Sequence, residues 1–412
     1  MAAHKTSLLR WIALVVLGLV TVSSCALPVP TLAEETTPVV LELEVEVSDD
    51  AAVDLSPVES EEVAVSLEEE ALESAIAESM ASMDLRTKLA GLMVVTVGGM
   101  NPQVLRDFYE RIPVAGFLLQ RDNLVGDSFT IRDLISQVQA GSDVPLIMAV
   151  DQEGNPVARI SGDEFPGARI LGAGSLEDTA AAFLARQQLV DRAGANVNFG
   201  IVADVSGGPG AYIHSRSFAT DATVVASHVA VATIAQVPEV AQTLKHFPGH
   251  GMVFADSHRT IPTADLTYDQ WRTTHALPFI AGIDAGVELV MTGHIRVPAV
   301  SKDPASVSDD WISILREDLG FEGVIITDDL RMLQSSGEAA FGDPALNAVA
   351  ALAAGNDVVL TAVDPGLDPD YETYDEILLA LENAVAKGLI SEEQVDLSLA
   401  RVLRLRSGLG TP

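Results

Sequence analysis

Eight short apolar segments alternate with longer amphipathic segments through residues 81–412. The apolar segments are rich in β-branched residues and lie at 92–97, 115–119, 145–150, 197–202, 243–247, 287–292, 323–327 and 357–361. Helical patterns separate them, for example at 176–193, 222–235, 268–285 and 309–319. Strands that alternate with helices form parallel sheets, because each helix returns the chain to the same edge. Eight such units predict a single α/β domain over 81–412, a (β/α)8 TIM barrel that ends with a helix at 391–406.

A doubly wound sheet is the alternative arrangement of alternating strands and helices. It would require the Gly-x-Gly-x-x-Gly fingerprint after the first strand, which this sequence does not contain. In barrel enzymes the chemistry lies at the C-terminal ends of the strands. Polar residues follow five of the expected strands, namely Asp151, Asp204, Lys245 with His246, His294 and Asp328. These positions are therefore the first candidates for an active site.

The first 25 residues have the pattern of a bacterial export signal. Lys5 and Arg10 accompany an apolar run over 11–22 that is too short to span a bilayer. The run ends at Val22-Ser23-Ser24-Cys25, which resembles a lipobox with Cys25 as the lipidated residue. An ordinary signal peptide with an incidental cysteine is the alternative. Cys25 is the only cysteine of the chain, so no intramolecular disulfide can form.

Residues 26–80 form an acidic segment between this signal and the expected barrel. They include 16 Asp and Glu, four prolines and no Lys or Arg, a composition that favours an extended, disordered tether. Local order is conceivable at 41–47, which alternates like a strand, and at 66–80, which has an amphipathic helical pattern. The formal net charge of the whole chain is −35, which argues against nucleic acid as a partner.

The densest group of chemically active side chains follows the fifth expected strand. It is Lys245-His246-Phe247-Pro248-Gly249-His250-Gly251, followed a few residues later by Asp256-Ser257-His258. Its Gly and Pro residues favour an irregular loop over a helix or strand. A metal site is one interpretation of these residue types. The spacing matches no zinc motif, however, and no second ligand cluster stands out, so we expect neither a metal nor another cofactor.

This stretch, written K-H-F-P-G-H-G-(x)4-D-S-H, resembles the signature of family 3 glycoside hydrolases of the β-N-acetylhexosaminidase type. A second match is G-V-I-I-T-D-D-L-R-M at 323–332. Three shorter matches are Asp151-Gln152-Glu153-Gly154, Phe165-Pro166-Gly167 and Arg216-Ser217-Phe218. The matches occur in the family's order, and the resemblance covers nearly all of the expected barrel. It implies the same barrel fold and the hydrolysis of glycosidic bonds.

The resemblance also implies catalytic roles. Asp328 corresponds to a carboxylate nucleophile, delivered to the barrel mouth by an apolar strand. Asp256 and His258 are similar to an Asp–His pair that serves as general acid/base. An imidazole suits this task, because its unperturbed pKa is about 6.5 and a hydrogen-bonded carboxylate orients it. The neighbouring Asp329 is expected to be a loop cap rather than a catalytic group.

Substrate contacts are implied for a further set of matched residues, Asp151, Arg216, Lys245 and His246. Their side chains can bind sugar hydroxyls or the N-acetyl carbonyl. A buried Lys245 also requires an anionic partner or a polar ligand, because its desolvation is otherwise costly. His250 is expected to support the loop, and the sequence leaves His294 open between the core and the site.

Three local departures from the family pattern affect loops. Met252-Val253 replaces the usual Asp-Thr, Asn155-Pro156-Val157 replaces Gly-Arg-Val, and Arg259-Thr260 replaces Leu-Gly. None of them removes an expected catalytic residue. They bear on the mobility of the loops and on the aglycone side of the specificity.

We therefore expect a retaining β-N-acetylglucosaminidase that acts on cell-wall muropeptides or related glycans. It is expected to be a monomer, anchored by lipid at the extracytoplasmic face of the cell membrane. A β-glucosidase or a phosphorylase of the same family is one alternative. β-Glucosidases of the family draw their acid from a second domain, whereas this sequence ends at Pro412. An inactive, surface-tethered sugar-binding protein is the other, although such a protein has no need of Asp328, Asp256 and His258 together.

Overall fold

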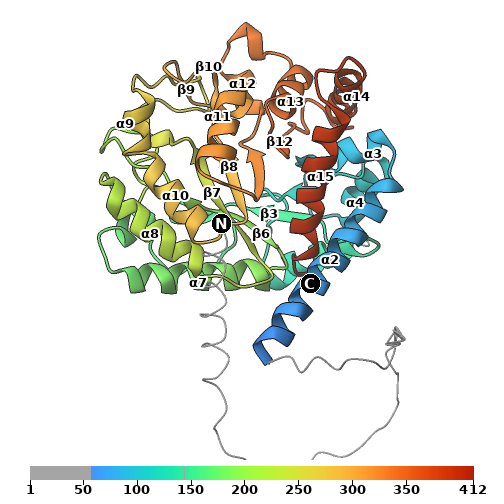
Figure 1. The fold of residues 1–412 in the computed structure, drawn as a ribbon, viewed down its shortest axis with the longest axis horizontal. Helices are drawn as coiled ribbons and strands as arrows, with labels where there is room; N and C mark the ends of the chain where they lie inside the picture. The colour runs from blue at the N-terminus through green and yellow to red at the C-terminus, as the bar shows by residue number, and fades with distance from the viewer. Residues whose placement is uncertain (1–56, 143) are drawn as a thin grey trace, which may run out of the picture. The chain divides into compact units, whose positions relative to one another are not determined.

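The computed structural model describes residues 57–142 and 144–412. The predicted signal peptide, Cys25 and residues 26–56 of the predicted tether lie outside these residues. Eight parallel strands form one sheet in the order β11-β8-β7-β6-β3-β2-β1-β12 (Figure 1). A parallel bridge between Ile326 and Val358 joins the first strand of this order to the last. The sheet thus closes into the predicted (β/α)8 barrel.

All eight predicted strands are present. They are β1 (Met93–Val95), β2 (Gly116–Leu118), β3 (Ile147–Val150), β6 (Val197–Val202), β7 (Ala241–Phe247), β8 (Leu289–Thr292), β11 (Val324–Thr327) and β12 (Val359–Thr361). Every residue of these strands is buried, which explains why they read as continuous apolar runs rather than as alternating ones.

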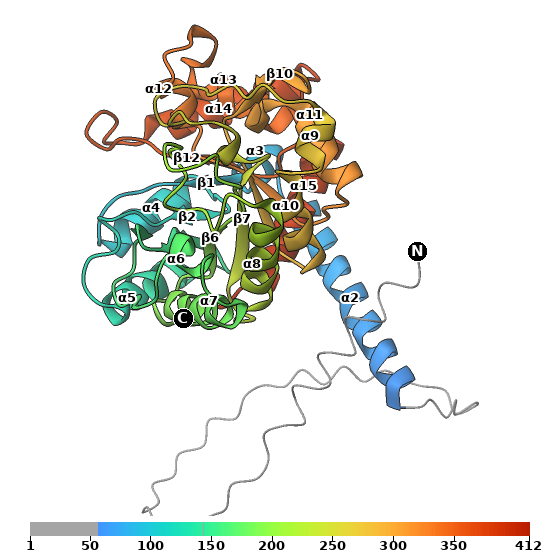
Figure 2. The ribbon, with the colours of Figure 1, turned by 90° about the vertical axis from the view of Figure 1, so that its left-hand side faces the viewer.

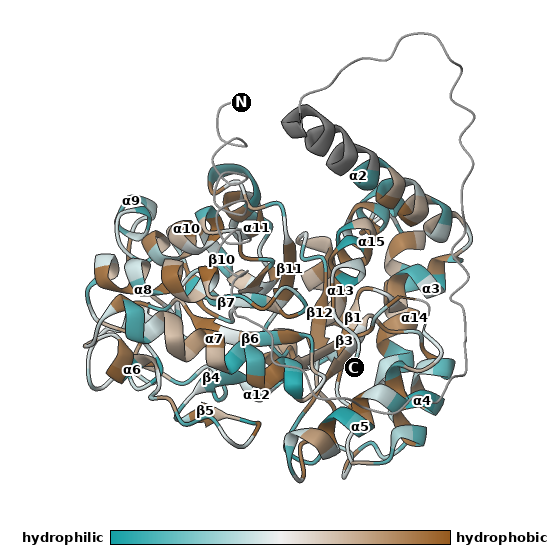
Figure 3. Cartoon of the chain, turned by 90° about the horizontal axis from the view of Figure 1, so that it is seen from below, coloured by the Kyte–Doolittle hydropathy of each residue, from teal (hydrophilic) through white to brown (hydrophobic). Residues whose placement is uncertain are grey.

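The main helices between the strands form the outer ring of the barrel. They are α4 (Pro102–Arg111), α5 (Ser128–Gln139), α7 (Leu176–Arg192), α8 (Ala222–Ile234), α10 (Ala276–Asp284), α13 (Pro344–Ala353) and α14 (Glu372–Ala386), with α15 (Glu392–Ser407) as the predicted final helix. Ser391 caps α15 by accepting a hydrogen bond from the Gln394 N–H at 3.0 Å. In Figure 3 the strands are mostly hydrophobic, whereas the helices carry both hydrophobic and hydrophilic residues.

Two predicted helices are not continuous. The pattern at 268–285 divides into α9 (Tyr268–Arg272) and α10, because Pro278 has no N–H and its ring would clash with the carbonyl of Thr274 in a single helix. The pattern at 309–319 is an α-helix only in α11 (Asp309–Ser313) and continues as a π-helix, η3 (Ile314–Asp318).

The acidic segment differs from its prediction at its C-terminal end. Residues 57–65, expected in a low-structure tether, and residues 66–80, which have an amphipathic helical pattern, belong to one helix, α2 (Pro57–Ala81) (Figure 2). Leu72, Ile76 and Met80, spaced four residues apart, bring one face of this helix onto the hydrophobic core. Glu73 pairs with Arg404 on α15 at 2.5 Å. Within the described residues, no helix has both the length and the apolar character required to cross a membrane.

Two small hairpins that the sequence did not predict extend the loops after β3 and β8. One pairs β4 (Gln152–Gly154) with β5 (Val157–Ala158), and the other pairs β9 (Arg296–Val297) with β10 (Ser301–Pro304). The first carries Glu153 and has Asn155 and Pro156 in its turn. One departure from the family pattern therefore lies in a hairpin turn beside the strand ends.

Candidate active site

The end of β7 delivers Lys245 into a buried, charged pocket. Lys245 Nζ lies 2.6 Å from Asp151 Oδ1 and 2.7 Å from Glu153 Oε1, and its side chain is only 3% exposed. The two carboxylates come from the chain just after β3, two strands away in the barrel. They are the anionic partners that a buried lysine requires.

Glu153 also binds Arg216 through both carboxylate oxygens. Arg216 Nε donates to Oε2 at 2.8 Å and Nη2 donates to Oε1 at 2.7 Å, the forked geometry that suits a guanidinium. Burial alone would raise the pKa of Glu153, but the charges of Arg216 and Lys245 outweigh it and hold this pKa well below its ordinary value. Glu153 is therefore a permanent anion that fixes two cations in place. This role of Glu153 was not predicted from its motif.

Asp204, which follows β6, organises the next part of the site. It is fully buried and accepts hydrogen bonds from His246 Nδ1 at 2.8 Å and from the His250 backbone N–H at 2.5 Å. His246 thus donates from Nδ1 and presents Nε2 on its other side, where Arg216 Nη2 lies 3.3 Å away. The buried Asp204 carboxylate therefore fixes the orientation of the His246 ring and the position of the backbone at the start of the following loop.

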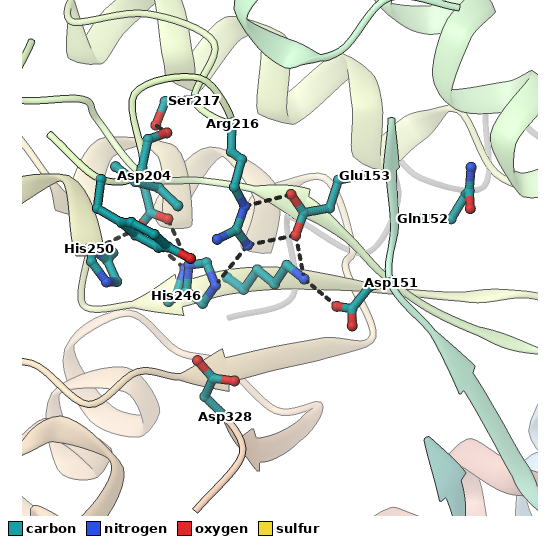
Figure 4. A network of polar contacts seen from close by, with 12 residues as sticks. Asp151, Gln152, Glu153, Asp204, Arg216, Ser217, His246, His250 and Asp328 are labelled. Carbon is teal, nitrogen blue, oxygen red and sulfur yellow. Dashed lines mark hydrogen bonds and ion pairs between the residues drawn. The ribbon is translucent and has the colours of Figure 1, made fainter. Parts of the chain in front are cut away.

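Asp328 lies directly after β11, where its backbone N–H donates to the Thr292 carbonyl at 2.8 Å. Figure 4 shows its carboxylate below His246, directed toward the network of Asp151, Glu153 and Arg216. Burial raises the pKa of Asp328, but the charges of His246 and His294, the N–H of Asp329 and the charge of Lys245 lower it further than burial raises it. Asp328 is therefore ionised at neutral pH, as a nucleophile must be.

Asp329 has the structural role that was predicted for it. Its Oδ1 accepts the backbone N–H groups of Arg331 at 3.0 Å and Ala362 at 2.9 Å, so it caps the turn after Asp328. Burial raises its pKa to about 6. His294 supports the same turn, because its Nε2 donates to the Asp329 carbonyl at 2.9 Å while Nδ1 contacts Ser306 Oγ at 2.7 Å. Both ring nitrogens of His294 are engaged with the protein, which assigns it to the support of the site.

Asp256 and His258 lie on the loop that follows β7 and form the expected pair. His258 Nδ1 lies 2.8 Å from Asp256 Oδ1, and the His258 backbone N–H donates to the same oxygen at 3.0 Å. The His258 side chain is 54% exposed, and its Nε2 makes no hydrogen bond with any described residue. The contact with Asp256 places the proton on Nδ1, which leaves Nε2 available to exchange a proton with a substrate.

The loop that carries this pair is attached to its surroundings through His250 and Tyr212. His250 is buried, its Nε2 lies 2.9 Å from Ser257 Oγ, and burial lowers its pKa to about 4, so it is a neutral support as predicted. Tyr212 was not predicted. Its ring packs 5.7 Å from that of His250 and 5.6 Å from that of His258, and its hydroxyl lies 3.3 Å from His258 Nδ1.

The structure therefore divides the predicted residues into two groups. Asp151, Arg216, Lys245 and His246 form one buried network with Glu153 and Asp204, and Asp328 faces it. The pair Asp256 and His258 forms no hydrogen bond or ion pair with that network within the described residues. In residues 57–142 and 144–412, no group of three or more His, Cys, Asp or Glu side chains is arranged to hold a metal ion.

The barrel carries a paired carboxylate and imidazole on the loop after β7. A second carboxylate, after β11, faces a buried polar network. Together with the closed parallel barrel, these groups are typical of a glycoside hydrolase. The chain belongs to glycosyl hydrolase family 3, because residues 75–405 match the model of the "Glycosyl hydrolase family 3 N terminal domain". This membership confirms the resemblance seen in the sequence motifs.

Named relatives agree with this family. The chain is 30% identical to "Beta-hexosaminidase A" of Pseudoalteromonas piscicida over 75% of this chain and 56% of that protein. It is 37% identical to a "Beta-hexosaminidase" of Stenotrophomonas maltophilia (strain R551-3) over 62% and 78% of the two. A solved structure of a family 3 β-N-acetylglucosaminidase from Paenibacillus sp. str. FPU-7 has a TM-score of 0.74 and 33% identity, covering 79% of this chain and 63% of that one. The chain thus spans less than two thirds of the length of two of these three.

Proposed function

We propose that this protein is a retaining β-N-acetylglucosaminidase that releases terminal β-linked N-acetylglucosamine. The observation that carries the proposal is the ionised Asp328 carboxylate, which faces a buried network of fixed donors and acceptors. The relatives named as hexosaminidases and the β-N-acetylglucosaminidase structure support the choice of sugar.

The first step breaks the glycosidic bond. An Asp328 oxygen attacks the anomeric carbon and forms a glycosyl ester, while the bond from that carbon to the leaving oxygen breaks. For this step His258 is doubly protonated: Asp256 holds the Nδ1–H, and Nε2 gives its proton to the leaving oxygen. Water then attacks the anomeric carbon and gives a proton to His258 Nε2, while the bond from that carbon to the Asp328 oxygen breaks and releases the carboxylate. Two inversions at the same carbon retain the configuration.

The buried network supplies the contacts that hold the sugar during these steps. Asp151 is partly exposed and can accept hydrogen bonds from sugar hydroxyls, whereas Lys245 and Arg216 can donate to hydroxyl oxygens or to the N-acetyl carbonyl. His246 Nε2 can accept a hydrogen bond from a sugar hydroxyl. Glu153 and Asp204 already fix these groups before the sugar arrives. Donors that need no rearrangement when charge develops are the most effective ones.

The decisive experiment compares aryl N-acetyl-β-glucosaminide with the plain aryl β-glucoside. We expect turnover of the first substrate, much weaker turnover of the second, and a first product with the β configuration by NMR. An α product would rule out the retaining mechanism, and preference for the glucoside would rule out the proposed sugar. Adding phosphate and analysing for glycosyl phosphate tests whether water is the acceptor.

We further propose cell-wall muropeptides as the substrate and a lipid anchor at Cys25 as the means of localisation. The support is the export pattern of residues 1–25 and the lipobox-like Val22-Ser23-Ser24-Cys25. The wild type should enter the membrane or detergent phase, and Cys25→Ala should lose the lipid. An unmodified Cys25 in a mature protein that remains in the aqueous phase would contradict the anchor. A single acyl chain binds only marginally, so a stable anchor requires more than one.

A further inference from the structure

Phe254 is a large aromatic side chain that remains 60% exposed on the loop of the catalytic pair. It precedes Asp256 by two residues and His258 by four. Its carbonyl accepts the backbone N–H of Tyr212 at 3.2 Å, so its position is tied to the segment after β6. Leaving a Phe side chain in water forgoes about 1.5–3 kcal/mol of burial free energy, which makes its exposure here informative.

The ring of Phe254 lies against backbone that carries no side chains. A Cβ placed on Gly207 would meet the ring at 3.4 Å, and one placed on Gly210 would meet it at 3.5 Å, both in van der Waals contact. The same Cβ on Gly207 would be only 3.1 Å from the Gly251 carbonyl oxygen, so that position is tight. The glycine backbone of the loop after β6 therefore supports one side of the ring while most of the side chain stays open.

Tyr212 connects Phe254 to the catalytic pair, Asp256 and His258. Tyr212 is itself 38% exposed, it is hydrogen-bonded to Phe254 through its backbone, and its ring packs against His258. Tyr212 thus connects the backbone of Phe254 to the ring of His258, and the side chains of all three residues are exposed.

We infer that Phe254 is the platform of a leaving-group subsite and stacks on the sugar ring that is released. This rests on the proposed function, in which His258 protonates the leaving oxygen. A group that receives its proton from His258 must lie against the loop that carries His258. Pyranose rings have apolar C–H faces, and aromatic rings commonly line sites that bind such faces.

The test compares two N-acetyl-β-glucosaminyl donors that differ only in the leaving group. N,N′-diacetylchitobiose releases a sugar that would occupy the platform, whereas N-acetyl-β-glucosaminyl fluoride releases only fluoride. For Phe254→Ala in the full chain we expect kcat/KM to fall about tenfold on the disaccharide, mainly through KM, and to stay within about twofold on the fluoride. Phe254→Tyr or Phe254→Trp should restore the disaccharide activity.

Phe129→Ala is the matched control, because Phe129 is 70% exposed at the start of α5 and belongs to no part of the site. Phe129→Ala should leave kcat/KM unchanged on both donors. Undiminished fluoride activity of Phe254→Ala shows at the same time that the variant is folded.

Each remaining outcome has a distinct meaning. If the wild type cleaves neither donor, the proposed function fails and the subsite with it. If the wild type cleaves both and Phe254→Ala lowers both equally, Phe254 supports the loop and the subsite assignment is overturned. An unchanged disaccharide rate also overturns it. So does light scattering that shows a wild-type dimer and a Phe254→Ala monomer, because the ring would then be an interface between two copies.

Discussion

The buried network and the loop of the catalytic pair, Asp256 and His258, differ in how strongly their charged groups are buried and paired. Lys245 is 3% exposed and is held by two carboxylates, whereas His258 is 54% exposed and is held by one. Inside the barrel each cation has a fixed partner, and electrostatic interactions are strong because little water screens them. On the loop, solvent screens the pair. In the proposed function, the buried network holds the sugar rigidly and the exposed loop meets a variable leaving group.

The largest effect should come from the carboxylate that faces the rigid part. Asp328→Asn keeps the size of the side chain but removes the nucleophile, so turnover of every substrate should fall on the order of 10⁴-fold or more, whatever the leaving group. Initial rates on a series of aryl N-acetyl-β-glucosaminides measure this. Substantial activity that persists on the most reactive aryl glycosides would remove Asp328 from its assigned role.

The loss of activity caused by substitutions in the exposed pair, Asp256 and His258, should instead depend on the leaving group. His258→Ala should reduce cleavage of a disaccharide about 10²- to 10⁴-fold, but should largely spare the first step with acidic phenols, which leave without a proton. In His258→Ala the second step, hydrolysis of the glycosyl ester, should slow, so that the ester accumulates. Asp256→Asn should act in the same direction more weakly. Pre-steady-state kinetics with phenols of graded acidity provide the measurement, and a loss that is equal for all phenols would contradict the assignment.

Neutralising an anion of the buried network should mainly affect stability. Glu153→Gln leaves Arg216 and Lys245 buried with one anion fewer, so the free energy of unfolding should fall by about 3–5 kcal/mol. The matched control is Glu338→Gln, which breaks the forked pair with Arg296, where Glu338 is 39% exposed. That variant should lose less than about 1 kcal/mol. Urea unfolding of both variants compares them, and equal losses would show that burial does not distinguish the two pairs.

The smallest expected effect is the pH dependence of the free energy of unfolding that Asp329 causes. Burial raises its pKa from 3.8 to about 6 in the folded state, so the folded protein holds a proton that the unfolded chain releases. The free energy of unfolding therefore decreases as pH rises through this window. Asp329→Asn keeps the Oδ1 acceptor and removes the titration. It should gain at most about 3 kcal/mol over the wild type near neutral pH and gain nothing in the acid range below the window. A difference that does not change with pH would contradict the shift.

The barrel could be predicted from the sequence because its eight strands are buried on both faces. Burial on both faces leaves a continuous apolar run, which is easy to recognise. The breaks in the helices were harder to predict. Pro278 was visible, but its effect depends on where the helix begins. The helix α2 was missed over 57–65 because its acidic composition resembles that of a tether, and only its packing through Ile76 shows why its C-terminal part is ordered.

Within the candidate site, the sequence predicted the residues that carry motifs and missed those that organise them. Glu153 stood inside a recognised motif, and the need of a buried Lys245 for an anion was a usable signal. Asp204 was noted only as a polar residue after a strand, because its hydrogen bonds join segments that are separated by more than 40 residues. Tyr212 and Phe254 left no pattern, since their importance comes from which rings and which glycines they meet in space.

The attachment of His250 to Asp204 has a consequence for protein engineering. The loop of the catalytic pair begins at a point fixed from both sides, because the His250 N–H is held by Asp204 and a Cβ on Gly251 would lie 1.8 Å from the Val205 carbonyl oxygen. Between that fixed point and the pair, Val253 is buried and the Phe254 carbonyl is hydrogen-bonded, whereas the Phe254 side chain is 60% exposed. If the proposed function holds, an exchange of residues 252–255 between related enzymes that keeps an apolar side chain at Val253 should alter the preferred aglycone and leave the contacts of the buried network unchanged.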